Sequence, residues 1–263
     1  MATNARPTAK DVAERLLILR CLVGHAMTTP PRGMLEGMRG AATAERWEEF
    51  SKDAEQRREQ FCQMLRGAGL WEKASPKEQE FMSVSGLNIT PQQHIDASWR
   101  LEAAQVIAWA LGFLESIPPY DTKAKQDLIM GIGPATEVLE LARLRPQPDI
   151  DKQRNLAELW HWRSRTRQLI DSGRPFPASD DLKAKGFSSY DDIVRFTAAR
   201  AAQAGYIPSP IDNDFPVMGK AYRDLSSQEW SQLRSLSKER HFALNWMCGY
   251  APGNRWDETP TGT

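Results

Sequence analysis

Apolar residues recur every three or four positions along most of the chain, and this spacing predicts α-helices almost everywhere. No useful length of sequence alternates between apolar and polar residues, as a half-buried strand would. We therefore predict an all-α protein that forms a single domain over residues 1–263. The expected helices cover about residues 9–24, 44–66, 76–83, 91–114, 122–131, 134–144, 150–171, 190–204 and 226–249.

The segment at about 91–114 is the predicted centre of the fold. Its large apolar residues step by three and four and so share one face: Ile95, Trp99, Val106, Trp109 and Phe113. Alanine, leucine and isoleucine occupy most of the other positions in its second half. A helix that is apolar on all sides is buried, so we expect the other helices to pack around this one.

Two segments are predicted to be loops. Residues 28–40 contain clusters of proline and glycine. Residues 206–224 contain three prolines and show no helical periodicity. Within the second loop, Asp212-Asn213-Asp214 is expected to form a turn that places Phe215 in the core.

Three charged residues lie on apolar stripes, where helical spacing predicts burial: Glu102, Arg163 and Arg240. Since isolated buried charges are costly, we expect Glu102 to pair with Arg240 or with Arg163. Arg100 is excluded as that partner, because residues two apart on a helix point to different sides. The favoured interpretation is a structural ion pair. The alternative is an anion or substrate pocket built from the two arginines.

His241 is the strongest candidate for a general base. Asn245 lies one turn further along the same helix and could orient the imidazole, and Asp257 in the C-terminal tail could lie beside it. The favoured alternative is a partly buried histidine that ties the tail to the last helix. Catalytic candidates are thus His241 and Asp257. The candidate binding or structural polar cluster comprises Arg100, Glu102, Arg163, Arg240, Asn245 and Trp256.

Other motifs do not indicate a metal or cofactor site. His94 and His161 belong to different predicted helices, and His161 is expected on a solvent face. No pair of cysteines has a metal-binding spacing, so we predict no metal ion and no cofactor. Cys21 and His25 are four residues apart, but a core cysteine followed by a histidine at a helix end explains them better than a catalytic pair.

Composition narrows the class of protein. Lysine plus arginine and aspartate plus glutamate both total 34, so there is no basic excess of the kind that nucleic-acid binders show. The segment Met1–Lys10 is polar and unlike a signal peptide, and no apolar run approaches the roughly 20 residues that cross a bilayer. Three scattered cysteines indicate free, mostly buried thiols in a reducing compartment. We expect a soluble cytoplasmic protein that binds neither nucleic acid nor membrane.

Two blocks carry a resemblance to a known family. They are Ser98-Trp99-Arg100-Leu101-Glu102 running into 107–112, and Glu239-Arg240-His241-Phe242-Ala243-Leu244-Asn245-Trp246 with the tail at 256–261. They resemble a bacterial family of unknown function, DUF4272. The resemblance implies an all-α bacterial protein and supplies no catalytic residues. Gly262 stands where the family's tail usually has an acid, which weakens a catalytic role for a tail carboxylate.

Two classes of function therefore stay open. The first is a non-enzymatic binding or protein-interaction domain, whose partner would be another protein. The alternative is a hydrolase or transferase of unrecognised type, with a cleft lined by Arg163, Arg240, Glu102, His241 and Asp257. The sequence leaves the oligomeric state open.

Overall fold

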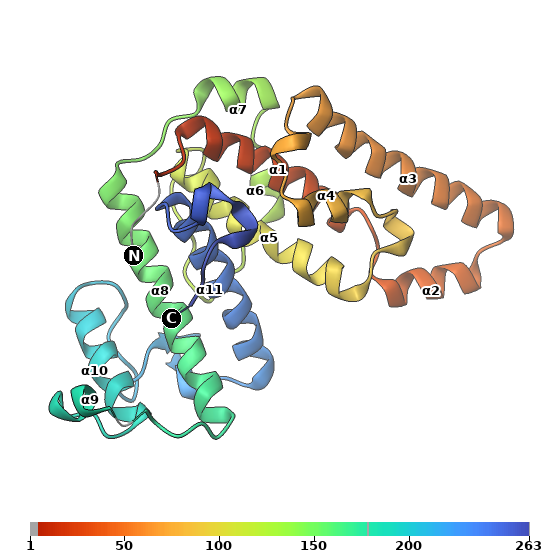
Figure 1. Cartoon of the computed structure of the whole chain (residues 1–263). Helices are drawn as coiled ribbons and strands as arrows, with labels where there is room; N and C mark the ends of the chain where they lie inside the picture. Colours follow the sequence, from red (N-terminus) through yellow and green to blue (C-terminus); the bar gives the residue numbers. More distant parts are fainter. Residues whose placement is uncertain (1–4, 178, 263) are drawn as a thin grey trace. The chain divides into compact units, whose positions relative to one another are not determined.

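The computed structural model describes residues 5–177 and 179–262 (Figure 1), so the first four residues of the Met1–Lys10 segment lie outside it. Within the described residues there are eleven α-helices and one very short two-stranded sheet, which confirms the all-α prediction. The helices are α1 (Ala9–Met27), α2 (Arg32–Ala41), α3 (Ala44–Gly67), α4 (Pro76–Ser83), α5 (Pro91–Ala110), α6 (Gln126–Met130), α7 (Ala135–Leu141), α8 (Gln147–Asp171), α9 (Asp180–Ala184), α10 (Tyr190–Gln203) and α11 (Ser227–Met247).

The described residues divide into two compact units. Unit 1 comprises 5–117, 124–151 and 242–260, and unit 2 comprises 118–123, 152–241 and 261–262, apart from residue 178. Two of the boundaries fall inside helices, one in α8 after residue 151 and one in α11 after residue 241. A single domain over 1–263 stays a prediction, and each unit is described by itself.

Unit 1 is built on the packing of α1 against α5. Both helices begin with a capping box, in which the first polar side chain and the residue three positions later satisfy each other's backbone N–H groups: Thr8 with Asp11, and Thr90 with Gln93. Every residue of α5 from 101 to 110 is buried, as a helix apolar on all sides should be. The central-helix prediction therefore holds for this half of α5.

The predicted helix at 91–114 is wrong in two details. Ile95 keeps 47% of its surface exposed, so the apolar face does not extend to the first turns. The helix ends at Ala110 because Gly112 takes a left-handed backbone conformation (φ 80°), which stops an α-helix at little cost only for glycine.

The loop predicted at 28–40 is wrong, because most of it forms α2. Met34, Leu35 and Met38 recur at helical spacing and outweigh the poor helix propensity of the glycines between them. Leu35 is the buried residue of this helix, and the other two face outward or lie at its edge.

Several short helices differ from their predicted ranges. The helix expected at 122–131 is reduced to five residues, α6, and the one at 134–144 to seven, α7. Helix α9 was not predicted from the sequence pattern; its Leu182 backbone N–H donates to the Ser179 hydroxyl, which caps the start of the helix. Helices this short are stabilised by packing against the rest of the protein more than by their own sequence. The apolar periodicity therefore did not fix their boundaries.

In unit 2, the segment 206–224 contains more structure than the predicted loop. Strands β1 (Pro216–Val217) and β2 (Lys220–Ala221) form an antiparallel hairpin. Met218 and Gly219 between them both have positive φ, which suits a tight hairpin turn. The turn at Asp212–Asp214 and the burial of Phe215 are confirmed.

The cysteines and the helix lengths can be compared with what the composition predicted. Cys21, Cys62 and Cys248 are free and buried, as predicted. Among the described residues, no helix combines the length and the apolar character that crossing a membrane requires.

Candidate functional site

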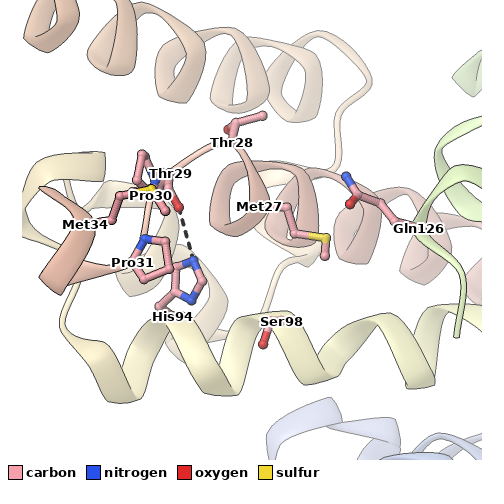
Figure 2. Close-up of a pocket in the computed structure, with 9 residues that line it drawn as sticks. All are labelled: Met27, Thr28, Thr29, Pro30, Pro31, Met34, His94, Ser98 and Gln126. Atoms are coloured by element: carbon pink, nitrogen blue, oxygen red, sulfur yellow. Dashed lines mark hydrogen bonds between the residues drawn. The ribbon is translucent and has the colours of Figure 1, made fainter. Parts of the chain in front are cut away.

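A cavity of about 390 Å³ opens in unit 1 where the connection from α1 to α2 crosses the first half of α5 (Figure 2). We call it the His94 pocket. Its lining consists of Met27, Thr28, Thr29, Pro30, Pro31, Met34, His94, Ser98 and Gln126. The volume lies within the range of small-molecule and side-chain binding sites in proteins.

The wall of this pocket is held rigidly at the end of α1. The Thr28 hydroxyl donates to the Gly24 carbonyl oxygen at 2.8 Å, and the Thr29 hydroxyl donates to the His25 carbonyl oxygen at 2.9 Å. Pro30 and Pro31 follow, and their rings fix the backbone φ before α2 begins. Little conformational freedom remains for this wall to lose when a ligand binds.

His94 joins this wall to α5. Its Nε2 lies 3.1 Å from the Thr29 carbonyl oxygen, the contact drawn as a dashed line in Figure 2. A carbonyl oxygen only accepts hydrogen bonds, so Nε2 must carry the hydrogen. In the neutral ring, Nδ1 is then the nitrogen that can accept a bond from a ligand.

Ser98 lies one turn beyond His94 on α5, which raises the question of a serine nucleophile. The Ser98 hydroxyl donates to the Ile95 carbonyl oxygen at 2.8 Å, an ordinary bond inside a helix. A nucleophilic serine would instead donate to its general base. The pair is therefore arranged for binding more than for covalent chemistry.

The surface of the His94 pocket is mainly apolar, and its polar side chains are hydroxyl, amide and imidazole groups. Met27 and Met34 expose 40% and 59% of their surface, and both line it. None of the nine lining residues is an aspartate, glutamate, lysine or arginine. Flexible methionine side chains adapt to ligands of different shape, which makes them common at binding surfaces.

The predicted polar cluster is distributed over both units. In unit 1, the Arg100 guanidinium carbon lies 4.8 Å from the Phe242 ring centre and 5.9 Å from that of Trp256. The Arg15 guanidinium carbon lies 4.8 Å from the Trp256 ring centre. These cation–π contacts, together with the burial of Trp256, fasten the C-terminal tail to unit 1.

Asn245 and Asp257 also hold this tail. The Asn245 side-chain amide donates to the Pro260 carbonyl oxygen at 2.8 Å. The Asp257 carboxylate accepts bonds from the Ser75 hydroxyl at 2.9 Å and the Lys77 backbone N–H at 3.3 Å. A carboxylate at the beginning of α4 also interacts favourably with the helix dipole. A role for Asp257 beside His241 stays a prediction.

Glu102 is buried, as its place on the apolar stripe predicted. Its Oε1 accepts a hydrogen bond from the Ala124 backbone N–H at 2.8 Å, which holds the segment that leads into α6. Pairing of Glu102 with Arg240 stays a prediction.

In unit 2, Arg163 forms a buried two-point ion pair with Asp214, with both N–O distances 2.6 Å. The Asp214 carboxylate also accepts bonds from the backbone N–H groups of Phe215 and Arg223. Burial alone would raise the pKa of Asp214, but the bonds and charge of Arg163 hold that pKa below its usual value. The carboxylate partner of Arg163 is therefore Asp214, whereas the sequence pattern predicted Arg163 as one of two possible partners of Glu102.

Arg240 is fully buried and clamps the segment 118–123 of unit 2. Its guanidinium donates to the carbonyl oxygens of Pro118, Pro119 and Thr122 at 2.7, 3.2 and 2.8 Å. The guanidinium carbon also lies 5.0 Å from the ring centre of Tyr120. This arrangement stabilises a proline-rich connection that has few backbone hydrogen bonds of its own.

His241 contacts a second imidazole that sequence reasoning had misplaced. Its Nδ1 lies 3.0 Å from Nδ1 of His161, and both residues are buried, so the prediction of a solvent-facing His161 is wrong. Burial, together with the positive charges of Lys238, Arg165 and Arg234, lowers the pKa of His161 to about 4.

Among the described residues, no group of three or more histidine, cysteine, aspartate or glutamate side chains gathers in an arrangement suited to a metal ion.

Comparison with known proteins confirms the family that the sequence suggested. The family model described as a domain of unknown function, DUF4272, matches residues 2–181, which is more than half of the chain. This range contains the block at 98–112, whereas the blocks at 239–246 and 256–261 lie beyond its end. Comparisons with curated proteins and with solved structures give no match. The chain belongs to the DUF4272 family.

Proposed function

We propose that this protein is a non-enzymatic binding protein, and that the His94 pocket of unit 1 receives an apolar side chain from a segment of a partner protein. The observation that carries the proposal is the exposure of Met27 and Met34 on the lining of a cavity whose wall is already fixed. Exposed apolar surface next to a preformed cavity is typical of protein-recognition sites.

The chemistry of the lining favours an uncharged peptide over other ligands. No lysine or arginine lines the pocket to bind a phosphate, which speaks against nucleic acid. Nδ1 of His94 can accept a hydrogen bond, and a peptide backbone N–H can donate one. An apolar side chain beside that N–H would lie against the two methionines.

Selection from a library of short random peptides displayed on phage tests this proposal. Enriched peptides should contain a large apolar residue in an uncharged stretch, and their affinity is measured with synthetic peptides by fluorescence anisotropy. Met34→Asp places a charge on the pocket and should weaken binding by about tenfold or more.

Leu141→Asp is the matched control. Leu141 is about as exposed as Met34 (56% against 59%), lies on α7 and does not line the pocket, so this variant should bind as the wild type does. If no peptide is enriched, or if the selected peptides bind Met34→Asp as tightly as the wild type, the proposal is wrong.

The alternative, a hydrolase or transferase with a cleft of arginine, glutamate and histidine, has weaker support. Glu102, Arg163, Arg240 and His241 are all buried. Arg163 is engaged by Asp214, and Arg240 by three backbone carbonyl groups. Groups held in this way are more typical of a structural role than of a site that turns over substrate.

We also propose a cytoplasmic location in a bacterial cell. Cys21, Cys62 and Cys248 are free thiols, as expected in a reducing compartment.

A further inference from the structure

A second, smaller cavity lies beside α1 in unit 1. It has a volume of about 170 Å³ and is formed by α1, the end of α3 and the beginning of α7, which lie together in Figure 1. Its walls are mainly apolar, with Leu17, Leu65 and Leu70 as buried residues. We call it the Arg20 cavity, after the one charged residue on its lining.

Arg20 is a half-buried cation without an acidic partner among the described residues. Its guanidinium donates to the carbonyl oxygens of Gly133 and Met130, at 3.0 and 3.4 Å. A guanidinium has five N–H donors, so these two bonds leave others available, and the positive charge is not neutralised. Burial lowers the pKa of Arg20, because desolvation disfavours the charged form.

The other polar group of the cavity does not balance this charge. The thiol of Cys21 lines the same space, and burial raises its pKa to about 12, so it stays neutral at physiological pH. An anion brought in by a ligand would supply the missing negative charge.

The size of the cavity limits what such a ligand can be. An engineered apolar cavity of about 150 Å³ holds one benzene molecule, so 170 Å³ has room for about six carbon atoms. Nucleotides and sugars are too large and too polar for this space. The space fits a short unbranched alkyl chain.

We propose that the Arg20 cavity binds a short-chain aliphatic carboxylate, with the alkyl chain between Leu17, Leu65 and Leu70 and the carboxylate on the Arg20 guanidinium. This site is separate from the His94 pocket, and the proposal does not depend on the proposed function.

The first test is a ligand series on the wild-type protein, followed by isothermal titration calorimetry or ligand-observed NMR. From butanoate to hexanoate, each added methylene should tighten the Kd about fourfold, and decanoate should gain nothing further because the cavity is full. Hexanoate should bind about tenfold more tightly than hexan-1-ol, which has the same chain without the charge, and hexylamine should bind more weakly still.

Two variants separate the charge from the cavity. Arg20→Met keeps an unbranched side chain and removes the charge, so it should weaken hexanoate binding about tenfold and leave hexan-1-ol binding unchanged. Ala135→Phe fills the space beside α7 and should abolish binding of both. Arg57→Met and Thr136→Phe, at positions outside the lining, are the matched controls and should bind as the wild type does.

The wild-type series alone can overturn the proposal, whether or not the variants fold. No binding of any carboxylate between butanoate and octanoate, or equal affinity for hexanoate and hexan-1-ol, contradicts it. So does hexanoate binding that survives both Arg20→Met and Ala135→Phe in folded protein, as judged by circular dichroism.

Discussion

The buried polar groups of unit 2 and the His94 pocket of unit 1 differ in their charged side chains. Unit 2 buries charged groups against fixed partners, whereas the His94 pocket of unit 1 has no charged residue on its lining. In unit 2, Arg163, Asp214 and Arg240 are buried and bonded to fixed partners within the unit. In unit 1, the pocket is uncharged, and its methionines face solvent. The charged residues that stand out in the sequence are held by fixed partners, and the pocket that we propose for binding has no aspartate, glutamate, lysine or arginine on its lining.

The largest expected effect follows from removing one partner of the ion pair in unit 2. Asp214→Ala leaves the Arg163 guanidinium buried without its carboxylate and should lower the free energy of unfolding by roughly 3 to 5 kcal/mol. Urea denaturation followed by tryptophan fluorescence measures the loss.

Asp171→Ala is the control for that experiment. The Asp171 side chain is 51% exposed, and Arg167 keeps its hydrogen bond to the Tyr222 carbonyl oxygen when the carboxylate is removed, so the loss should be about 0.5 kcal/mol or less. A loss below about 1 kcal/mol for Asp214→Ala would mean that the buried pair does not stabilise unit 2.

A smaller effect is expected from acid. The pKa of His161 is lowered to about 4 in the folded protein, below the value of about 6.5 in an unfolded chain, so the folded state favours the neutral ring. The stabilisation of the folded state by the neutral His161 ring is complete above pH 6.5. It is lost as the pH falls toward 4, and the total loss is limited to roughly 3 kcal/mol. The groups that act on this imidazole are His241, Lys238, Arg165 and Arg234.

The pH dependence is measured as the urea midpoint between pH 7 and pH 4, for the wild type and for His161→Gln. The variant should have a flatter profile over this interval, because it lacks the group that takes up the proton. Titration of Asp214 does not contribute to the difference between the two pH profiles, since the pKa of its carboxyl is held below the usual carboxylate value. Identical profiles for the two proteins would show that His161 is not the responsible group.

The smallest effect on stability is expected at the His94 pocket. Met34 is 59% exposed, so Met34→Asp should change the free energy of unfolding by about 0.5 kcal/mol or less, although it should greatly weaken peptide binding. A large loss of stability in this variant would mean that Met34 belongs to the core and would remove the distinction between the two regions.

Local features were predictable from the sequence, and long-range pairings were not. The helix starts predicted at residues 76 and 91 and the apolar second half of α5 depend on residues a few positions apart, and all are present in the structure. The pairing of Arg163 with Asp214 joins positions 51 residues apart, and nothing in either segment specifies the other.

The His94 pocket was missed for a different reason. Its wall lies in the segment 28–40, which glycine and proline made look like a loop, and His94 was considered only as a metal ligand. The helical spacing of Met34, Leu35 and Met38 was the available signal for α2. The proximity of Thr29 to His94 was not accessible from the sequence, because it depends on how α1 packs on α5.

Hydrogen exchange measured by mass spectrometry, with and without a peptide selected on the wild-type protein, tests the central claim most directly. The account predicts that bound peptide slows exchange in the segments at 27–35 and 91–98, and leaves exchange unchanged around Arg163, Asp214 and Arg240. Slower exchange confined to those three positions of unit 2, with none at 27–35, would contradict it.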